Sequence, residues 1–554
     1  MDSTLLFAAA ALGVANHVFF HRYEPRSANT ALPLLLSAPA ALLLFLGGPI
    51  STARLAWSNA VFLASLSLSI AAYRLSPFHP LAQYPGPAIG KVTRLWGVFI
   101  ACRGYRYLYY KKLHDRYGPY IDVTGLFLAD VRTGPNELSV IDAPAVAQIL
   151  NAGGLDKGRY YEAGRHSGTP PSLVSLVGEA HTAKRRAWSR ALTSVAIRDY
   201  EPLIRKRARQ LVACLANQAG PTDLVFWLDL FSFDLTGDLA FGGGFEFMRD
   251  GEDAGSMGQK IRGFLKAATL SGQLPWIVPT LHLFPQVGRI IQEFNDFGQR
   301  LAINRMKNGS PGTKDLWYHL ADEAGLEKQR PTLEASAAEG IVAVVAASDT
   351  TASALSSLLW FLLSNPECYR RVQEELDRVF ADGEDPLDAS KHQQLVYLCA
   401  CINETLRLHP PVPTNGPRQV HLDQAGRTIT GRYIPPGTSV YTPAYSLHRS
   451  PDYFFPHPDQ FVPDRWLPAA ESPVKFKHDT AAFIPFSLGP ANCVGQKFAK
   501  REMLMVVSLL LKAFRVEFAD GFESETWPTR IHDHFVASRG PLLVKLTGQH
   551  GYCP

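Results

Sequence analysis

The cysteine of this chain with the most informative surroundings is Cys493, in a glycine-rich segment near the C-terminus. Residues 486–495 read Phe-Ser-Leu-Gly-Pro-Ala-Asn-Cys-Val-Gly, so Gly489 lies four residues before the cysteine and Gly495 two residues after it. Glycine permits positive φ and lets the backbone come close to a large flat partner. A thiolate in such a turn is a soft iron ligand, and thiolate-ligated haem iron favours cleavage of the O–O bond. The alternative is a buried free cysteine in a glycine-rich loop.

A second pair of residues that could take part in a reaction, Asp349 and Thr350, lies inside a long apolar stretch. The stretch runs from about Leu333 to Leu363, and Pro366 follows it, which predicts one long helix. The acidic residues within it argue against a membrane span. In a helix of this kind, a threonine hydroxyl can simply bond back to the carbonyl of the preceding turn and bend the helix.

Two further pairs have the spacing of helix neighbours. Glu404 and Arg407 lie three residues apart in a run, residues 395–408, that is predicted to be a helix ending before two prolines. His181 and Arg185 lie four residues apart and share one helical face. Taken alone, such pairs are most often solvated surface groups.

Together, these segments resemble the cytochrome P-450 family. Its haem-binding loop has the pattern F-x-x-G-x-R-x-C-x-G, which Phe486, Gly489, Cys493 and Gly495 match. Ala491 departs from it, because the family usually has an arginine or histidine there that reaches a haem propionate. The resemblance implies that Cys493 is the axial ligand of haem iron. It covers about residues 85–545.

The resemblance also assigns a structural cluster. Glu404 and Arg407 match the family's E-x-x-R helix, and residues 461–466 are similar to its F-x-P-E-R-F/W segment, with Asp464 in place of the glutamate. Arg465 would then join Glu404 and Arg407 in a buried ionic cluster that holds the scaffold of the cysteine loop. Breaking such a cluster is strongly destabilising.

On the oxygen-binding side, residues 346–351 resemble the family's A/G-G-x-D/E-T-T/S element, with Ala347 in place of glycine. This implies that Thr350 holds water or oxygen above the haem and that Asp349 relays protons. The resemblance further implies that His181, Arg185 and Arg418 contact the haem propionates. An arginine can bind a carboxylate through two parallel hydrogen bonds.

The implied fold is mainly α with small β-sheets (α+β), with a long central helix over haem b. The implied reaction inserts one atom of O₂ into a small apolar substrate, by hydroxylation or epoxidation. The sequence shows no dinucleotide-binding fingerprint, so electrons from NADPH would arrive through a separate NADPH-cytochrome P-450 reductase. The alternatives are an isomerase or dehydratase of this fold that acts without O₂, and a haem sensor without turnover. No residue selects a substrate.

Composition is consistent with one large catalytic domain over residues 91–554. The 554-residue chain is 46% hydrophobic and shows no linker or repeat after residue 90. Its seven cysteines are odd in number and scattered, which indicates a reducing compartment rather than a disulfide framework. Net charge is +5, and no basic cluster is dense enough to predict nucleic-acid binding.

The first 80 residues differ from the rest and are predicted to be a membrane anchor. Three stretches without Asp, Glu, Lys or Arg, at about residues 4–20, 31–50 and 57–73, are each near the length of a span. The distribution of arginine predicts a lumenal N-terminus and a cytosolic catalytic domain; two spans with a re-entrant segment remain an alternative. Residues 81–90 contain Tyr-Pro-Gly-Pro and are predicted to be a stiff hinge. Such an anchor resembles that of fungal members of the family. This resemblance implies that the protein lies in the membrane of the endoplasmic reticulum.

Overall fold

The structure is a computed structural model. It describes residues 3–23, 27–47, 51–118, 120–121, 127–128, 130–163, 170–243, 245–251, 257–281, 285–309, 314–468 and 474–549. The α-helices are α1 Ser3–Arg22, α2 Ala28–Phe45, α3 Thr52–Leu75, α4 Ala88–Val92, α5 Leu95–Cys102, α6 Arg106–Tyr117, α7 Ala143–Leu150, α8 Gly178–Ala191, α9 Ser194–Ala216, α10 Leu224–Phe241, α11 Phe247–Asp250, α12 Met257–Gln273, α13 Val278–Leu281, α14 Pro285–Asn308, α15 Leu316–Leu320, α16 Leu333–Ser364, α17 Pro366–Val379, α18 Val396–Leu408, α19 Ala444–Leu447 and α20 Gln496–Ala513.

The strands are short and form small sheets, so the expected mainly α fold with small β-sheets is confirmed. They are β1 Tyr120–Ile121, β2 Phe127–Leu128, β3 Asp130–Gly134, β4 Glu137–Val140, β5 Asp156–Lys157, β6 Thr222–Asp223, β7 Arg418–Gln419, β8 Arg427–Ile429, β9 Arg432–Ile434, β10 Ser439–Tyr441, β11 Phe454–Phe455, β12 Lys477–His478, β13 Phe514–Phe518, β14 His532–His534, β15 Val536–Ser538 and β16 Leu543–Gly548.

The largest sheet has the order β3-β4-β10-β7-β5. Its β4–β10 pair is parallel and its other pairs are antiparallel. At one edge, Lys157 of β5 is the direct cross-strand partner of Arg418 of β7. Two like charges in this position repel each other and destabilise the pair. A negatively charged group near this edge of the sheet would remove that repulsion.

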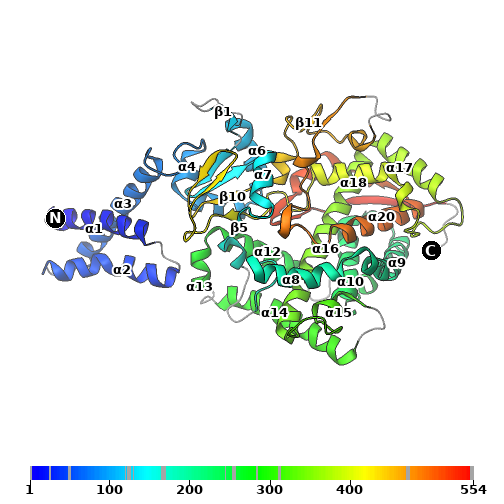
Figure 1. The fold of residues 1–554 in the computed structure, drawn as a ribbon, viewed down its shortest axis with the longest axis horizontal. Coiled ribbons are helices and arrows are strands. Elements are labelled where there is room, and N and C mark those ends of the chain that lie inside the picture. The colour runs from blue at the N-terminus through cyan, green and yellow to red at the C-terminus, as the bar shows by residue number, and fades with distance from the viewer. Residues whose placement is uncertain are drawn as a thin grey trace.

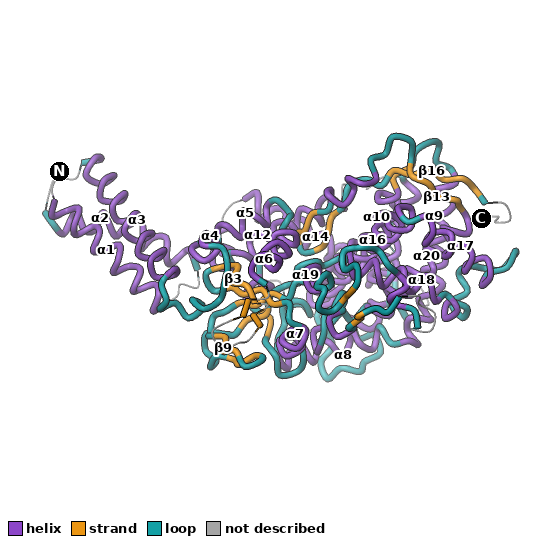
Figure 2. The backbone as a smooth tube through the Cα atoms, turned by 90° about the horizontal axis from the view of Figure 1, so that it is seen from above, coloured by secondary structure: helices purple, strands orange, loops and turns teal. Residues whose placement is uncertain are grey.

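The N-terminal helices α1, α2 and α3 form a separate group that projects from one end of the molecule (Figures 1 and 2). Helices α1 and α3 are each long and apolar enough to cross a membrane, whereas the apolar part of α2 is shorter, Ala31–Phe45, and contains two prolines. The group is fastened to the rest of the chain at its end, where Arg74 Nη1 donates to the carbonyl of Val92 at 2.6 Å. These helices therefore suggest membrane anchoring.

Helix α16 runs through the core of the helical part of the molecule, against α10, α14, α18 and α20. It also has the length and apolarity of a membrane span, but two thirds of its most apolar window is buried inside the protein. Two of its buried hydroxyls are satisfied within the helix: Ser348 Oγ donates to the carbonyl of Val344 at 2.6 Å, and Ser356 Oγ to that of Ala352 at 2.7 Å. These bonds explain how a helix with several hydroxyls can lie in an apolar core.

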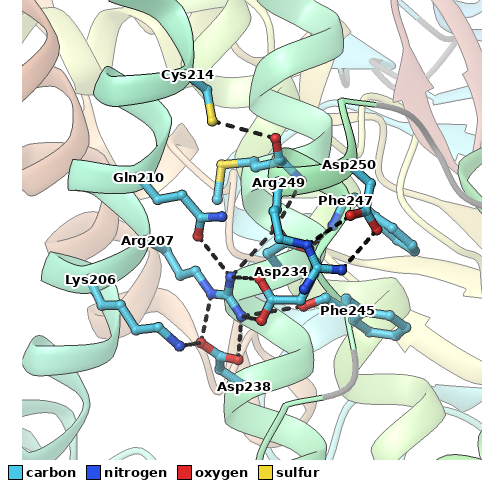
Figure 3. Close-up of polar contacts among 12 residues, drawn as sticks. Lys206, Arg207, Gln210, Cys214, Asp234, Asp238, Phe245, Phe247, Arg249 and Asp250 are labelled. Atoms are coloured by element: carbon cyan, nitrogen blue, oxygen red, sulfur yellow. Dashed lines mark hydrogen bonds and ion pairs between the residues drawn. The ribbon is translucent and has the colours of Figure 1, made fainter.

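A buried charge network joins α9 to α10 and to the segment that follows it (Figure 3). The guanidinium of Arg207, 1% exposed, donates to both carboxylate oxygens of Asp238 at 2.7 Å and to Glu246 at 3.0 Å. Asp234 lies 3.7 Å away and accepts the backbone N–H of Phe247 at 2.9 Å. Among the described residues, Arg207 is therefore the one buried cation among these carboxylates, and the exposed Lys206, 3.6 Å from Asp238, adds a weaker positive charge at the edge of the network (Figure 3).

Replacing Arg207 with methionine is expected to lower the free energy of unfolding by about 3–5 kcal/mol, because it leaves buried carboxylates without a counter-charge. Chemical unfolding followed by circular dichroism measures the loss. The matched control is Arg209→Met, since Arg209 is half-exposed and pairs with Asp385 at the surface. That change is expected to cost under about 1 kcal/mol, and equal losses for the two variants would contradict the prediction.

Candidate active site

One cavity of about 490 Å³ lies between α16 and the loop that precedes α20. The α16 wall includes Val342, Ala346 and Thr350, and the loop contributes Phe486 and Cys493. The remaining lining is mostly apolar and aromatic, from segments near residues 160–161 and 170–175, from α10 and α12, and from residues 535–536. Residues 164–169, between the first two of these segments, lie outside the described residues. The cavity suits an apolar small molecule.

Local backbone geometry presents Cys493 to this cavity. A short turn, Gly489–Ala491, precedes Cys493. The backbone N–H of Cys493 donates to the carbonyl of Phe486 at 2.8 Å. Gly489 has φ of 72°, and a Cβ there would lie 2.1 Å from the carbonyl oxygen of Leu150, so only glycine fits. The cysteine side chain is exposed to the cavity.

The surroundings of the sulfur act in two directions. Burial in a largely apolar wall raises the pKa of the Cys493 thiol, while the backbone N–H groups of Gly495 and Gln496 and the charge of Arg185 oppose that rise. Amide donors at the start of a helix stabilise a thiolate once it forms. Of the residues that the structure describes, no three His, Cys, Asp or Glu side chains gather to hold a bare metal ion. Cys493 therefore presents one thiol to the cavity, with nearby donors that favour its anion.

On the α16 wall, Thr350 reaches the cavity but Asp349 does not. Thr350 Oγ1 donates to the carbonyl of Ala346 at 2.6 Å, the back-bonding alternative considered from the sequence. Asp349 is 5% exposed and is not among the residues that line the cavity. Its carboxylate instead lies 3.5 Å from Arg539 Nη1, which also donates to the backbone carbonyl of Asp349 at 3.1 Å.

Arg539 links Asp349 to a second buried acid, Asp229 of α10. Arg262 of α12 lies 3.4 Å from the other oxygen of Asp229. Burial, and the nearby charge of Asp349, raise the pKa of Asp229 to about 6 against the opposing effect of the two arginines. A chain of alternating charges thus leads from the surface arginine Arg262 to the acid of α16.

Replacing Asp229 with asparagine is expected to change how stability depends on pH. The folded pKa of Asp229 lies above its unfolded value, so the folded state binds this proton more tightly and the stabilisation from it disappears as pH rises from about 4 to 6. The free energy of unfolding of the wild type, relative to Asp229→Asn, should therefore fall across this window by on the order of 2–3 kcal/mol.

Thermal or urea unfolding of both proteins at pH 4, 5, 6 and 7 checks this expectation. Asp520→Asn, at an exposed side chain, controls for the loss of one carboxylate. A constant difference between the wild type and Asp229→Asn over the whole range would show that Asp229 does not titrate there.

Four basic side chains gather beside the cysteine loop: Lys157, His181, Arg185 and Arg418. Burial, followed by the charges of Arg418 and Arg185, lowers the pKa of Lys157 to about 7. Burial and the other three bases also lower the pKa of His181 to about 4. Such a cluster is unfavourable unless an anion compensates it.

Only some of the nitrogen donors of these four basic side chains have hydrogen-bond partners among the described residues. Arg185 Nη1 and Nη2 donate to the backbone and side-chain oxygens of Asn492, each at 2.6 Å, which ties α8 to the cysteine loop. Lys157 Nζ donates to the carbonyl of Leu173 at 2.8 Å. Arg418 is 7% exposed, and among the described residues its Nε has no hydrogen-bond partner.

Comparison with known proteins decides the family. The family model "Cytochrome P450" matches residues 87–545. A cytochrome P450 monooxygenase, FCK2 of Fusarium pseudograminearum, is 34% identical over 493 residues, covering 88% of this chain and 85% of that protein. This chain belongs to the cytochrome P450 family. The averantin hydroxylase of Dothistroma septosporum is 29% identical, over 96% of each chain, and the tryprostatin B 6-hydroxylase of Aspergillus fumigatus is 28% identical, over 89% of this chain and 85% of that protein.

The protein is accordingly a fungal-type P450 monooxygenase, an oxidoreductase that uses haem iron, O₂ and electrons from a redox partner on an apolar substrate. The residues present fit a haem. Cys493 supplies a soft ligand on one wall of the P450 cavity, and the basic cluster with the unsatisfied Nε of Arg418 calls for anions such as the two propionates. No carboxylate of the described protein takes that place at Arg418.

The E-x-x-R helix of this P450 is part of a fully buried ion cluster. Glu404 accepts two hydrogen bonds from Arg407 at 2.8 Å and one from Arg465 at 3.1 Å. Trp466 Nε1 and the backbone N–H of Val462 also donate to it, each at 2.9 Å. All five donors converge on one carboxylate whose side chain is 0% exposed, and the cluster thereby fixes residues 462–466 to α18.

Several residues of the site carry no local sequence signal. Arg539 lies 190 residues after its partner Asp349, and Lys157 is placed only by its pairing with β7. The sequence also gives no signal for the role of Glu339. Its carboxylate accepts hydrogen bonds from Trp188 Nε1 at 2.8 Å and from the backbone N–H of Leu173 at 3.1 Å. Glu339 thereby holds α8, which carries His181 and Arg185, against α16.

Proposed function

We propose that this P450 is anchored in the endoplasmic reticulum membrane and oxygenates a small apolar metabolite in fungal secondary metabolism, with electrons from NADPH delivered by NADPH-cytochrome P450 reductase. The observation that carries the proposal is an apolar cavity that has Cys493 in one wall and Thr350 in another. Relatives named for the hydroxylation of averantin and tryprostatin B support hydroxylation as the reaction type.

The roles proposed for the haem-binding residues follow from their placement. Cys493 ligates the iron of haem b, while Phe486, Gly489 and Gly495 shape the loop around it. His181, Arg185 and Arg418 bind the propionates, and Lys157 adds a fourth base where Ala491 cannot contribute one. When bound, the haem supplies the site at which O₂ binds and is activated by reduction.

The proposed role of Thr350 is to accept a hydrogen bond in the cavity. Its hydroxyl proton is engaged by the carbonyl of Ala346, which leaves the lone pairs of Oγ1 for a water. Asp349 supplies protons to that water after its carboxylate turns from Arg539 towards the cavity. Thr350 thus holds the water and Asp349 supplies the proton, while the apolar lining excludes bulk water from the substrate.

The proposed organisation has an anchor of up to three spans over residues 1–80, a hinge over 81–90 and a catalytic domain over 91–554. The described lengths of α1 and α3 support two spans directly. The basic residues after the third helix favour a cytosolic catalytic domain, and with three spans the N-terminus then lies in the lumen. This orientation gives a cytosolic reductase domain access to the P450.

The proposal is tested with full-length protein in microsomes or nanodiscs that contain the reductase. Given NADPH, ¹⁸O₂ and candidate apolar substrates, one ¹⁸O atom should enter the product for each turnover. Product formation without O₂ or NADPH would point instead to an isomerase or dehydratase, and haem binding without any turnover to a sensor. Either result would contradict the proposal.

Thr350→Ala should lower the yield of product per NADPH oxidised by about fivefold, because it removes a hydrogen bond worth about 1 kcal/mol from the proton supply. NADPH oxidation is expected to continue. Parallel assays of NADPH, H₂O₂ and product measure the ratio. Thr350→Ser keeps the hydroxyl and should retain most of the coupling; an unchanged ratio in Thr350→Ala would remove Thr350 from the mechanism.

A further inference from the structure

A second cavity, of about 560 Å³, lies beside the first but is lined by different residues. Its walls come from α5 and α6, from the chain after α18, from α16 and from the C-terminal segment around residues 528–537. The volume is within the usual range of small-molecule sites, about 300–1,000 Å³. No role in oxygenation requires this space.

The two cavities lie on either side of a partition formed by β15 and α16. Along β15, Val536 lines the active-site cavity and Ala537 lines the second one, as expected for successive residues of a strand. The backbone N–H of Ala537 donates to the carbonyl of Pro411 at 2.8 Å, which closes the partition. On α16, Thr350 lines the first cavity and Ser353 the second.

The walls of the second cavity are apolar, and its only formally charged lining residues are cations. Phe99, Ile100 and Ile531 contribute to an apolar wall, whereas Arg103 and Lys112 are exposed. Among the described residues that line it, none is Asp or Glu. The Arg103 guanidinium lies 4.7 Å from the centre of the Phe99 ring, so a ring face covers one side of it while its N–H edge stays available for an anion.

Three residues that line this cavity, Phe99, Arg103 and Lys112, are exposed, so its mouth lies at α5 and α6, close to the end of the anchor. Helix α5 follows directly after α4, to which Arg74 of the anchor is bonded. Leu95 and Phe99 of α5 are 63% and 43% exposed, an apolar surface beside the cavity mouth. The cavity therefore opens on the side of the catalytic domain that carries the anchor.

We propose that the second cavity binds a single-chain anionic amphiphile, with its alkyl chain against the wall of Phe99, Ile100 and Ile531 and its acidic head at Arg103 and Lys112. The volume, and the two cations that line the same cavity, suit one chain with one head. The same chemistry is offered by a free long-chain carboxylate and by a lysophospholipid with an acidic phosphate. A bound chain contacts the side of α16 next to Thr350 and stabilises the partition between the cavities.

The test measures binding of palmitate and of lysophosphatidate to delipidated, haem-loaded, full-length protein by native mass spectrometry and calorimetry. A saturating imidazole inhibitor occupies the first cavity throughout, so that only the second is available. One amphiphile per protein is expected, and hexadecanol, which lacks the charge, should bind at least tenfold more weakly. If only palmitate binds, the site takes a carboxylate head, and if only lysophosphatidate binds, it takes a phosphate head; both results support the site. Binding of neither would overturn it.

Charge reversal separates this site from general attraction. Arg103→Glu with Lys112→Glu should weaken amphiphile binding at least tenfold. Arg116→Glu with Lys328→Glu makes the same change of net charge at exposed positions outside the cavity and should leave binding unchanged. Ile100→Trp should weaken binding by filling the chain site while the melting temperature holds. Equal affinity in all variants, or displacement of the amphiphile by the inhibitor, would overturn the proposal.

Discussion

Cys493→Ser is expected to abolish oxygenation while leaving the fold intact. A serine hydroxyl is a hard and neutral ligand at physiological pH, so it cannot donate the electron density that a thiolate gives to haem iron. Turnover should fall at least about a hundredfold, and the reduced, CO-bound protein should lose the strongly red-shifted Soret band of a thiolate-ligated haem.

The structure explains why the fold should survive this change. The turn is held by backbone features, the bond from the Cys493 N–H to Phe486 and the left-handed Gly489, rather than by the sulfur. Serine is nearly isosteric, so the free energy of unfolding should change by under about 1.5 kcal/mol. Cys102→Ser, at an exposed position in α5, is the matched control and should keep both the band and the activity. A red-shifted band in Cys493→Ser would mean that another residue ligates the iron.

Elements with a strong local signal could be predicted from the sequence. The helix expected over 395–408 is α18, Val396–Leu408, because the prolines that follow it end the run. The apolar stretch from Leu333 to Leu363 is α16, with Thr332 as its N-cap and Pro366 beginning the next helix. The acidic residues within this stretch correctly indicated a core helix rather than a membrane span.

The partners of the site residues could not be predicted in the same way. The sequence places Asp349 directly before Thr350 in a predicted helix. Whether the carboxylate of Asp349 faces the cavity or Arg539 depends on where the C-terminal strands pack. Likewise, Ala491 indicated a missing propionate contact, while Lys157, which brings a positive charge to the same region, is positioned by a strand pairing with Arg418. Contacts between distant segments leave no periodic pattern in the sequence.

The second large effect is expected for Glu404→Gln, which should prevent accumulation of haem-loaded protein. Burial alone would raise the pKa of Glu404, but the hydrogen bonds and charges of Arg407 and Arg465 lower it overall. The carboxylate is thus ionised at neutral pH, and its stabilising effect is lost only as pH falls through the depressed pKa. An amide keeps the shape but leaves two fully buried guanidinium groups without their counter-charge, at about 3–5 kcal/mol.

That loss is a large part of the 5–15 kcal/mol by which a typical domain is stable. Its effect is concentrated where residues 462–466 pack on α18. Co-expression with excess haem, followed by the CO spectrum and urea unfolding, measures the yield and the stability. The matched control is Asp464→Asn, because Asp464 pairs with Arg371 at 2.9 Å while both side chains remain partly exposed, so its loss should be under about 1 kcal/mol. If Glu404→Gln instead binds haem and unfolds like that control, the cluster does not hold the scaffold of the Cys493 loop, and packing of the surrounding apolar residues must do so.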